Sequence, residues 1–225
     1  RDWSSDVCSS DLGNALLRGG GRPGDLLFLS GTVGAAGAAV AYFFRGRHEG
    51  VRVDPQTQAA LKEAWSRARP AIAQGAWLGS AGVSKCALDT SDGLKAGLQE
   101  IATRSNLDVV VLEESIPIAE CARVVAEAMD LPAVEMALSD SVDFRLLFSV
   151  PPARASEVRG HFAEQGWDLF EIGCLRVATG SPRISMISES SGELEVPGLP
   201  WDQADVATVD RLRGGRSNQP SEVDR

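Results

Sequence analysis

Hydrophobic positions along the chain form two kinds of pattern, short apolar runs and longer stretches with a helical period. Apolar runs of about four to eight residues between turn residues are typical of strands, and longer stretches with apolar residues three or four positions apart are typical of helices. The short runs predict strands at residues 26–29, 84–88, 109–112, 144–150, 169–172, 175–178 and 184–187. The longer stretches predict helices at residues 33–44, 56–69, 92–105, 118–129 and 153–165.

Two of these helices have clear signals. Residues 92–105 place Leu94, Leu98 and Ile101 on one face, which is the stripe expected of a helix that packs on a core. Residues 56–69 end at Pro70, which cannot continue a helix. Helices that alternate with strands at this pace indicate a layered α/β or α+β domain, and the order of the strands does not follow from the pattern.

Three segments differ in composition. Residues 1–12 (RDWSSDVCSSDL) have neither period and are interpreted as a non-native artefact. Residues 13–202 carry the α/β pattern. Residues 203–225 are polar and rich in Gly, Arg and Ser, with too few apolar residues to offset the entropy of ordering, so a disordered tail is expected.

The net charge of the chain limits the kinds of partner that it can bind. A net charge of −9 argues against a nucleic acid or an anionic membrane, because both require a dense basic surface. A small anionic substrate is compatible with this charge only where a helix N-terminus or a bound cation meets it. Cys8, Cys86, Cys121 and Cys174 have no paired spacing and no histidine close in sequence, which argues against zinc and favours reduced thiols in the cytoplasm.

Residues 86–94 (CALDTSDGL) carry the most informative motif. A strand ends at Asp89 and a helix follows, so Ser91 is expected to be its N-cap, with Asp89 and Asp92 on either side. The helix N-terminus favours a phosphate, and the two carboxylates suit Mg²⁺, which binds through one or two carboxylates together with nucleotide oxygens. The same residues also fit an ordinary turn with a helix cap, and local pattern does not decide between the two.

Several motifs, in one order, resemble the thiamine-monophosphate kinases of the aminoimidazole ribonucleotide synthetase-like superfamily. The run 89–94 is similar to their D-x-S-D-G-L signature, and Arg18 with residues 24–34 (GDLLFLSGTVG) is similar to R-x5-G-D followed by a T-G-T-L-G turn. Residues 69–75 resemble their R-P-x-P…G stretch. Residues 140–148 (DSVDFRLLF) stand where the G-G-E-D-Y-E-L-L-F run is expected.

The resemblance implies a C-terminal α/β domain that closes over ATP, with a remnant of an N-terminal domain that forms a homodimer. It implies that Asp89 and Asp92 bind magnesium, that Ser91 contacts ATP and that Arg18 reaches the ATP phosphates. It also implies that Trp201 packs on the thiamine group. The implied reaction is ATP-dependent phosphorylation of thiamine monophosphate to thiamine diphosphate. From their local sequence alone, Arg18 also fits a solvated loop residue and Trp201 a residue that covers the core.

Two features depart from the resemblance. Val142 stands where the family run has its first Glu, and the family's N-terminal metal cluster would precede the first residue of this chain. Two other hypotheses therefore stay open: another ATP-using member of the superfamily with a different small substrate, and a non-catalytic module for ligand binding or dimerisation.

Because Asp89 and Asp92 would supply only part of the metal ligands, we expect the 225-residue chain alone to have little or no kinase activity. An assay of ATP-dependent phosphorylation of thiamine monophosphate checks this. Normal turnover by this chain would contradict it.

Overall fold

The computed structural model describes residues 15–46, 50–138, 141–190 and 192–196. Its strands are β1 (Leu26–Leu29), β2 (Cys86–Asp89), β3 (Leu107–Leu112), β4 (Leu146–Val150), β5 (Phe170–Val177), β6 (Ile184–Ser188) and β7 (Gly192–Glu195). Its α-helices are α1 (Ala35–Val40), α2 (Pro55–Ser66), α3 (Ile72–Ala81), α4 (Leu94–Ser105), α5 (Glu120–Ala128), α6 (Ala133–Leu138) and α7 (Ala155–Glu164). A π-helix, η2 (Ala41–Gly46), continues α1, and the 3-10 turns η3 (Glu113–Ser115) and η4 (Pro152–Arg154) precede α5 and α7.

The described strands form one mixed sheet in the order β2-β4-β1-β5-β3-β6-β7. β3 and β6 are parallel, and every other neighbouring pair is antiparallel. β4 lies between β1 and β2 and runs opposite to both. The residue at which β4 begins therefore lies at the same end of the sheet as the residues at which β1 and β2 finish.

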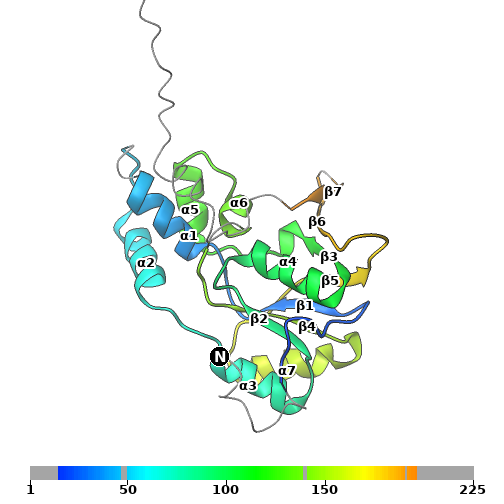
Figure 1. The fold of residues 1–225 in the computed structure, drawn as a ribbon. Helices are drawn as coiled ribbons and strands as arrows, with labels where there is room; N and C mark the ends of the chain where they lie inside the picture. Colours follow the sequence, from blue (N-terminus) through cyan, green and yellow to red (C-terminus); the bar gives the residue numbers. More distant parts are fainter. Residues whose placement is uncertain (1–14, 47–49, 139–140, 191, 197–225) are drawn as a thin grey trace, which may run out of the picture.

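Helices cover both faces of the sheet (Figure 1). On one face, α4 buries Leu94, Leu98 and Ile101 to 1% exposure or less, as its sequence stripe predicts, and packs them against β-strand residues such as Leu147. On the other face, α3 and α7 pack Leu78 and Phe162 into a second core cluster. The sheet is thus the middle layer of an α/β domain, and the predicted fold class is confirmed.

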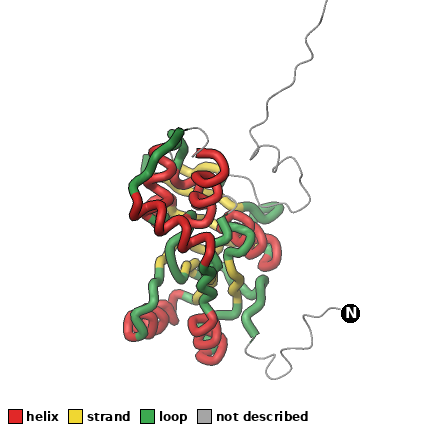
Figure 2. The backbone as a smooth tube through the Cα atoms, turned by 90° about the vertical axis from the view of Figure 1, so that its left-hand side faces the viewer, coloured by secondary structure: helices red, strands yellow, loops and turns green. Residues whose placement is uncertain are grey.

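A third cluster is made mainly of helices. α1, η2, α2 and α5 bury Ala38, Tyr42, Leu61 and Val125 against one another. Figure 2 shows this helical layer at one end of the molecule, with the strands below it. The Ala-rich segment predicted as one buried helix is therefore buried as expected, but it changes from α-helix to π-helix at Ala41.

One strand prediction is wrong. The pattern splits residues 169–178 into two strands, whereas the structure has the single strand β5. The expected gap falls at residues 173–174, and Gly173 has a packing reason: a Cβ there would lie 2.0 Å from the carbonyl oxygen of Val110 on β3. Glycine inside a strand often marks such a close approach of two backbones rather than an interruption.

The pattern also missed α3, α6 and β7. α3 contains Gly75 and Gly79, which lower helix propensity, and it follows directly after Pro70 and a short connection. α6 is six residues long and follows Pro132, and β7 is a short edge strand with Glu193 and Glu195. Elements this short depend on their neighbours more than on their own sequence period.

None of the described helices is both long enough and apolar enough to cross a membrane. The predicted artefact at residues 1–12, the predicted tail at residues 203–225 and the last part of the predicted 13–202 domain lie outside the described residues.

Candidate functional site

Three loops meet at the end of the sheet where β1 and β2 finish and β4 begins. They are residues 30–34 after β1, residues 89–93 after β2 and residues 141–145 before β4. Ser30 exchanges hydrogen bonds with Leu146: its N–H donates to the Leu146 carbonyl (3.0 Å) and its Oγ accepts from the Leu146 N–H (2.8 Å). Thr90 does the same with Arg145, at 2.8 Å from the Thr90 N–H and 3.0 Å to its Oγ1. Segments far apart in sequence are therefore fixed side by side.

The 89–93 loop differs from its prediction in one respect. Gly93, with φ of 87°, is the N-cap of α4, and no side chain caps this helix. The predicted N-cap role of Ser91 is therefore wrong. The Gly93 N–H donates to the Thr90 carbonyl (3.2 Å), which closes a turn and delays the helix until Leu94. Ser91 instead donates its hydroxyl to Asp89 Oδ1 at 2.8 Å.

Asp89 and Asp92 are both exposed, and neither forms an ion pair with a Lys or Arg of the described residues. Two exposed carboxylates without cationic partners, next to a helix start without a side-chain cap, are available to a cation and an anion together. Among the described residues, no three His, Cys, Asp or Glu side chains are grouped to hold a metal. The oxygen donors present fit Mg²⁺ only as a partial set that nucleotide oxygens would complete.

The 141–145 loop caps helix α1. Asp143 accepts hydrogen bonds from the backbone N–H groups of Gly34 (2.7 Å) and Ala36 (3.1 Å) and from the hydroxyl of Ser141 (2.6 Å). Ser141 Oγ accepts from the Gly37 N–H at 2.9 Å. The N–H groups at a helix start have no acceptors within their own helix, and the side chains of Asp143 and Ser141 provide these acceptors. Asp143 is thus committed to the fold.

Arg18 lies away from this end of the sheet. Leu17, the residue before Arg18, forms a β-bridge with Cys86, the first residue of β2. Asp89 is the last residue of β2 and lies about 10 Å from Cys86 along the strand. The Arg18 guanidinium, 69% exposed, is 3.7 Å from the carboxylate of Glu100 on α4. The structure therefore brings Asp89, Ser91 and Asp92 together and does not bring Arg18 to them. The predicted contact between Arg18 and the ATP phosphates stays a prediction, and Trp201 lies outside the described residues.

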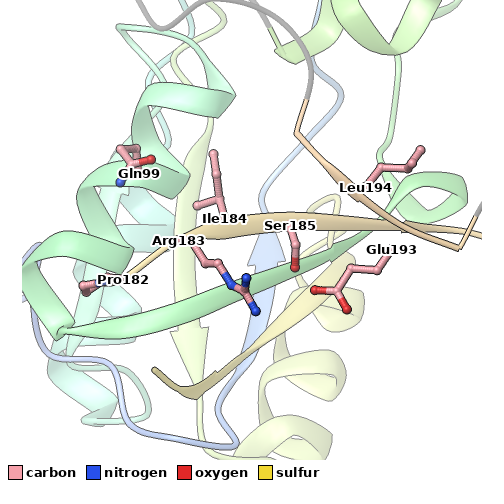
Figure 3. Close-up of a pocket in the computed structure, with 7 residues that line it drawn as sticks. All are labelled: Gln99, Pro182, Arg183, Ile184, Ser185, Glu193 and Leu194. Atoms are coloured by element: carbon pink, nitrogen blue, oxygen red, sulfur yellow. The ribbon is translucent and has the colours of Figure 1, made fainter. Parts of the chain in front are cut away.

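A cavity of about 350 Å³ adjoins the meeting point of the loops, between α1, α2 and the 141–145 loop, and Arg145 is part of its wall. A larger cavity, of about 660 Å³, lies at the opposite edge of the sheet. Figure 3 shows Arg183, Ser185 and Glu193 extending toward one side of that second cavity. Because β2 and β7 are the two edge strands, the larger cavity is far from Asp89 and does not serve the same site.

The model of the AIR synthase related protein, C-terminal domain family matches residues 22–187. The match covers most of the chain, including all three loops. The chain belongs to this family. It is also 32% identical over 143 residues to the thiamine-monophosphate kinase of Pyrococcus abyssi, a match that covers 64% of this chain and 42% of the relative.

A comparison with a second curated relative gives a similar match. The thiamine-monophosphate kinase of Halobacterium salinarum is 32% identical over 156 residues, which are 68% of this chain and 48% of the relative. The chain thus spans about half the length of the curated relatives that it matches.

Solved structures give the same family fold. The thiamine-monophosphate kinase of Stenotrophomonas maltophilia superposes with a TM-score of 0.67 at 25% identity, over 82% of this chain and 55% of that chain. A structure of AaThiL complexed with AMPPCP and TMP has a TM-score of 0.61 at 26% identity, over 75% of this chain and 50% of that chain. HypE of E. coli, a hydrogenase maturation protein, has a TM-score of 0.60 at 19% identity and shares the fold.

Sequence reasoning missed the part played by two residues at the junction. Thr90 is fully buried and links two loops through its backbone and its hydroxyl, and the sequence motif assigns it no role. Arg145 donates from Nε to the carbonyl of Thr32 at 3.0 Å and so reaches the third loop. The available signal was the presence of a charged residue directly before an apolar strand, which is common and does not identify a contact.

Asp143→Ala tests the structural part of this junction. We expect the free energy of unfolding to fall by roughly 1–3 kcal/mol, because the N–H groups of Gly34 and Ala36 lose a charged acceptor. Urea denaturation followed by tryptophan fluorescence measures the change. The control is Asp168→Ala, an exposed wall residue of the same cavity, for which a change within about 0.5 kcal/mol is expected. Equal losses in the two variants would contradict the capping role.

Proposed function

We propose that this chain carries the nucleotide-phosphate site of a thiamine-monophosphate kinase, which transfers the γ-phosphoryl group of ATP to thiamine monophosphate with the help of Mg²⁺. Asp89 and Asp92 hold the metal, and Ser91 contacts ATP. The chain's kinase relatives and the complex of AaThiL with AMPPCP and TMP support the reaction class.

The observation that supports this proposal most directly is that Asp89 and Asp92 are exposed and have no cationic partner among the described residues. Both are exposed at a helix start without a side-chain cap, and no Lys or Arg of the described residues neutralises either. Asp89 accepts a hydrogen bond from Ser91 in its own loop, and neither carboxylate has a cationic partner among the described residues. A magnesium-bound polyanion would supply that partner, because the metal's positive charge joins the carboxylates to the phosphates.

Phosphoryl transfer requires few further groups from this loop. Phosphoryl transfer depends on positioning the reactants and neutralising charge more than on a protein nucleophile. Bound Mg²⁺ would neutralise phosphate charge, Asp89 and Asp92 would hold it, and the Ser91 hydroxyl, now bonded to Asp89, would orient that carboxylate or turn to the nucleotide. The positive end of the α4 dipole would favour the same anion.

A second candidate is another ATP-using member of the superfamily that acts on a different small substrate. The observation that favours it is Val142, an apolar side chain in the wall of the 350 Å³ cavity where the family run has Glu. Both candidates use the same nucleotide site and differ only in the molecule that accepts the phosphoryl group.

The proposal extends to the whole protein. The full-length enzyme is a cytoplasmic homodimer that binds thiamine monophosphate as its small-molecule partner, with Trp201 packed on the thiamine group. These features rest on the resemblance to the kinases, since Trp201 lies outside the described residues.

The double variant Asp89→Asn/Asp92→Asn tests the metal site. We expect the affinity for AMPPCP in Mg²⁺ to fall by roughly tenfold or more, because neutral amides are poor magnesium ligands. Affinity measured in EDTA should hardly change. Isothermal titration calorimetry with and without Mg²⁺ gives both values.

The matched control is Asp130→Asn, which removes an exposed carboxylate after α5, at a residue with φ of 54° that Asn also tolerates. It should bind AMPPCP like the unaltered chain. If the double variant keeps the full effect of Mg²⁺, the proposed metal site is wrong.

A further inference from the structure

The 660 Å³ cavity at the β7 edge of the sheet, the far-edge cavity, is separate from the proposed nucleotide site. Its wall comes from α4 (Gln99), from the residues directly before β6 (Pro182 and Arg183), from β6 (Ile184 and Ser185) and from β7. The loop of the proposed metal site follows β2, which is the opposite edge strand. The far-edge cavity therefore has no part in the proposed function.

Three polar side chains of this wall lie on one face of the β6–β7 pair. Glu193 of β7 pairs with Ile187 of β6. Directly paired residues point to the same face of a sheet, and so do residues two positions apart on one strand. Glu193 therefore shares a face with Ser185, and Ser185 shares it with Arg183. Figure 3 shows Ser185 between the other two, with all three side chains extending to one side.

The hydroxyl of Ser185 is the buried polar group of this wall. Ser185 is 8% exposed, and its Oγ has no hydrogen-bond partner among the residues that the structure describes. Two other buried strand serines do have such partners, since Ser149 donates to Asp25 and Ser188 donates to Glu114. Buried hydroxyls are nearly always hydrogen-bonded, because burial separates them from water. The Ser185 hydroxyl is therefore available to a molecule in the cavity.

Arg183 is anchored beside this hydroxyl. Its backbone N–H donates to Asp108 Oδ1 at 3.1 Å, and its Nε lies 3.8 Å from Asp108 Oδ2. The side chain is 70% exposed, and its two terminal nitrogens contact no other residue in the described part of the chain. A guanidinium with both terminal nitrogens available can hold a carboxylate or a phosphate through two hydrogen bonds.

Glu193 supplies the opposite charge. It is exposed on the edge strand, and no Lys or Arg within the described ranges pairs with it. Its pairing partner, Ile187, is four residues from Arg183, which is roughly 13 Å of strand. The two side chains shorten this span without closing it. It suits a ligand whose own charges are several carbon atoms apart, and an α-amino acid, whose charges flank one carbon, is short for it.

We propose that the far-edge cavity binds a small zwitterionic molecule, with its anionic group at Arg183 and the Ser185 hydroxyl and its amine at Glu193. The wall carries one positive and one negative side chain, so a ligand with both charges is complementary to it, whereas a simple anion or cation meets one unfavourable charge. The inference does not rest on the proposed function, because the nucleotide site lies at the other edge of the sheet.

Binding of 6-aminohexanoate, a zwitterion with a flexible chain between its charges, tests this inference. Nuclear magnetic resonance of the unaltered chain should show saturable amide shifts centred on residues 183–185 and 193–194. Hexanoate, hexylamine and glycine should each bind about tenfold more weakly or less, because hexanoate and hexylamine lack one charge and glycine is too short to reach both side chains.

Three variants locate the binding groups. Arg183→Gln should weaken binding of 6-aminohexanoate by about tenfold and Ser185→Ala by roughly three- to tenfold, because each removes donors to the anionic group. Glu193→Gln should abolish the preference for 6-aminohexanoate over hexanoate, because the amine then meets no carboxylate. Glu189→Gln, which changes an exposed carboxylate between β6 and β7, is the matched control and should bind like the unaltered chain.

Thermal unfolding of each variant shows that the chain is folded. Ser185→Ala should unfold at the same temperature as the unaltered chain, because the hydroxyl has no partner in the described fold. A marked loss of stability in this variant would show that the hydroxyl serves the fold and would contradict the proposal. The absence of saturable binding, equal binding of hexanoate, hexylamine or glycine, shifts centred elsewhere, or unchanged binding by Arg183→Gln and Glu193→Gln would overturn it.

Discussion

The antiparallel position of β4 between β1 and β2 is the constraint on which the site depends. It places the start of β4 beside the ends of the other two strands, and the paired hydrogen bonds of Thr90 with Arg145 and of Ser30 with Leu146 fix the loops there. Each loop contributes a different property. The loop after β2 contributes two carboxylates, and the loop after β1 contributes the start of α1 and its backbone. The loop before β4 contributes the side chains that cap α1 and the guanidinium of Arg145.

Charge is distributed unevenly around this junction. The chain has a net charge of −9, and Asp89 and Asp92 lack cationic partners among the described residues, whereas the wall of the neighbouring cavity has three arginines and three acidic residues. In the proposed function, the acidic loop after β2 binds a metal cation and the adjacent start of α4 favours the anion that the cation carries. Asp143 differs from Asp89 and Asp92, because it accepts hydrogen bonds from the start of α1 and from Ser141 and so stabilises the fold.

Much of this could be predicted from the sequence, where local pattern and packing agree. The stripe of α4, the strand β1 and the α/β class followed from hydrophobic period, and the kinase resemblance led to the family that the chain belongs to. The errors arose where long-range contacts decide. The pattern predicted a gap at residues 173–174, where the structure has a continuous strand with Gly173 against Val110, a residue distant in sequence. Ser91 was predicted as the cap because the turn closed by Thr90 and Gly93 cannot be read from the motif. Arg145 gave no specific signal, since its contacts with Thr32 and Thr90 exist only after the sheet has formed.

The central claim is that a divalent cation and a nucleotide bind at the loop after β2. Nuclear magnetic resonance with Mn²⁺ in place of Mg²⁺, in the presence of AMPPCP, tests it most directly, because the paramagnetic ion broadens the signals of nearby amides. The account predicts broadening centred on residues 89–94, with the amides of β7 at the far edge of the sheet unaffected. Broadening centred on the far-edge cavity around Arg183 and Glu193, or no localised broadening, would contradict it.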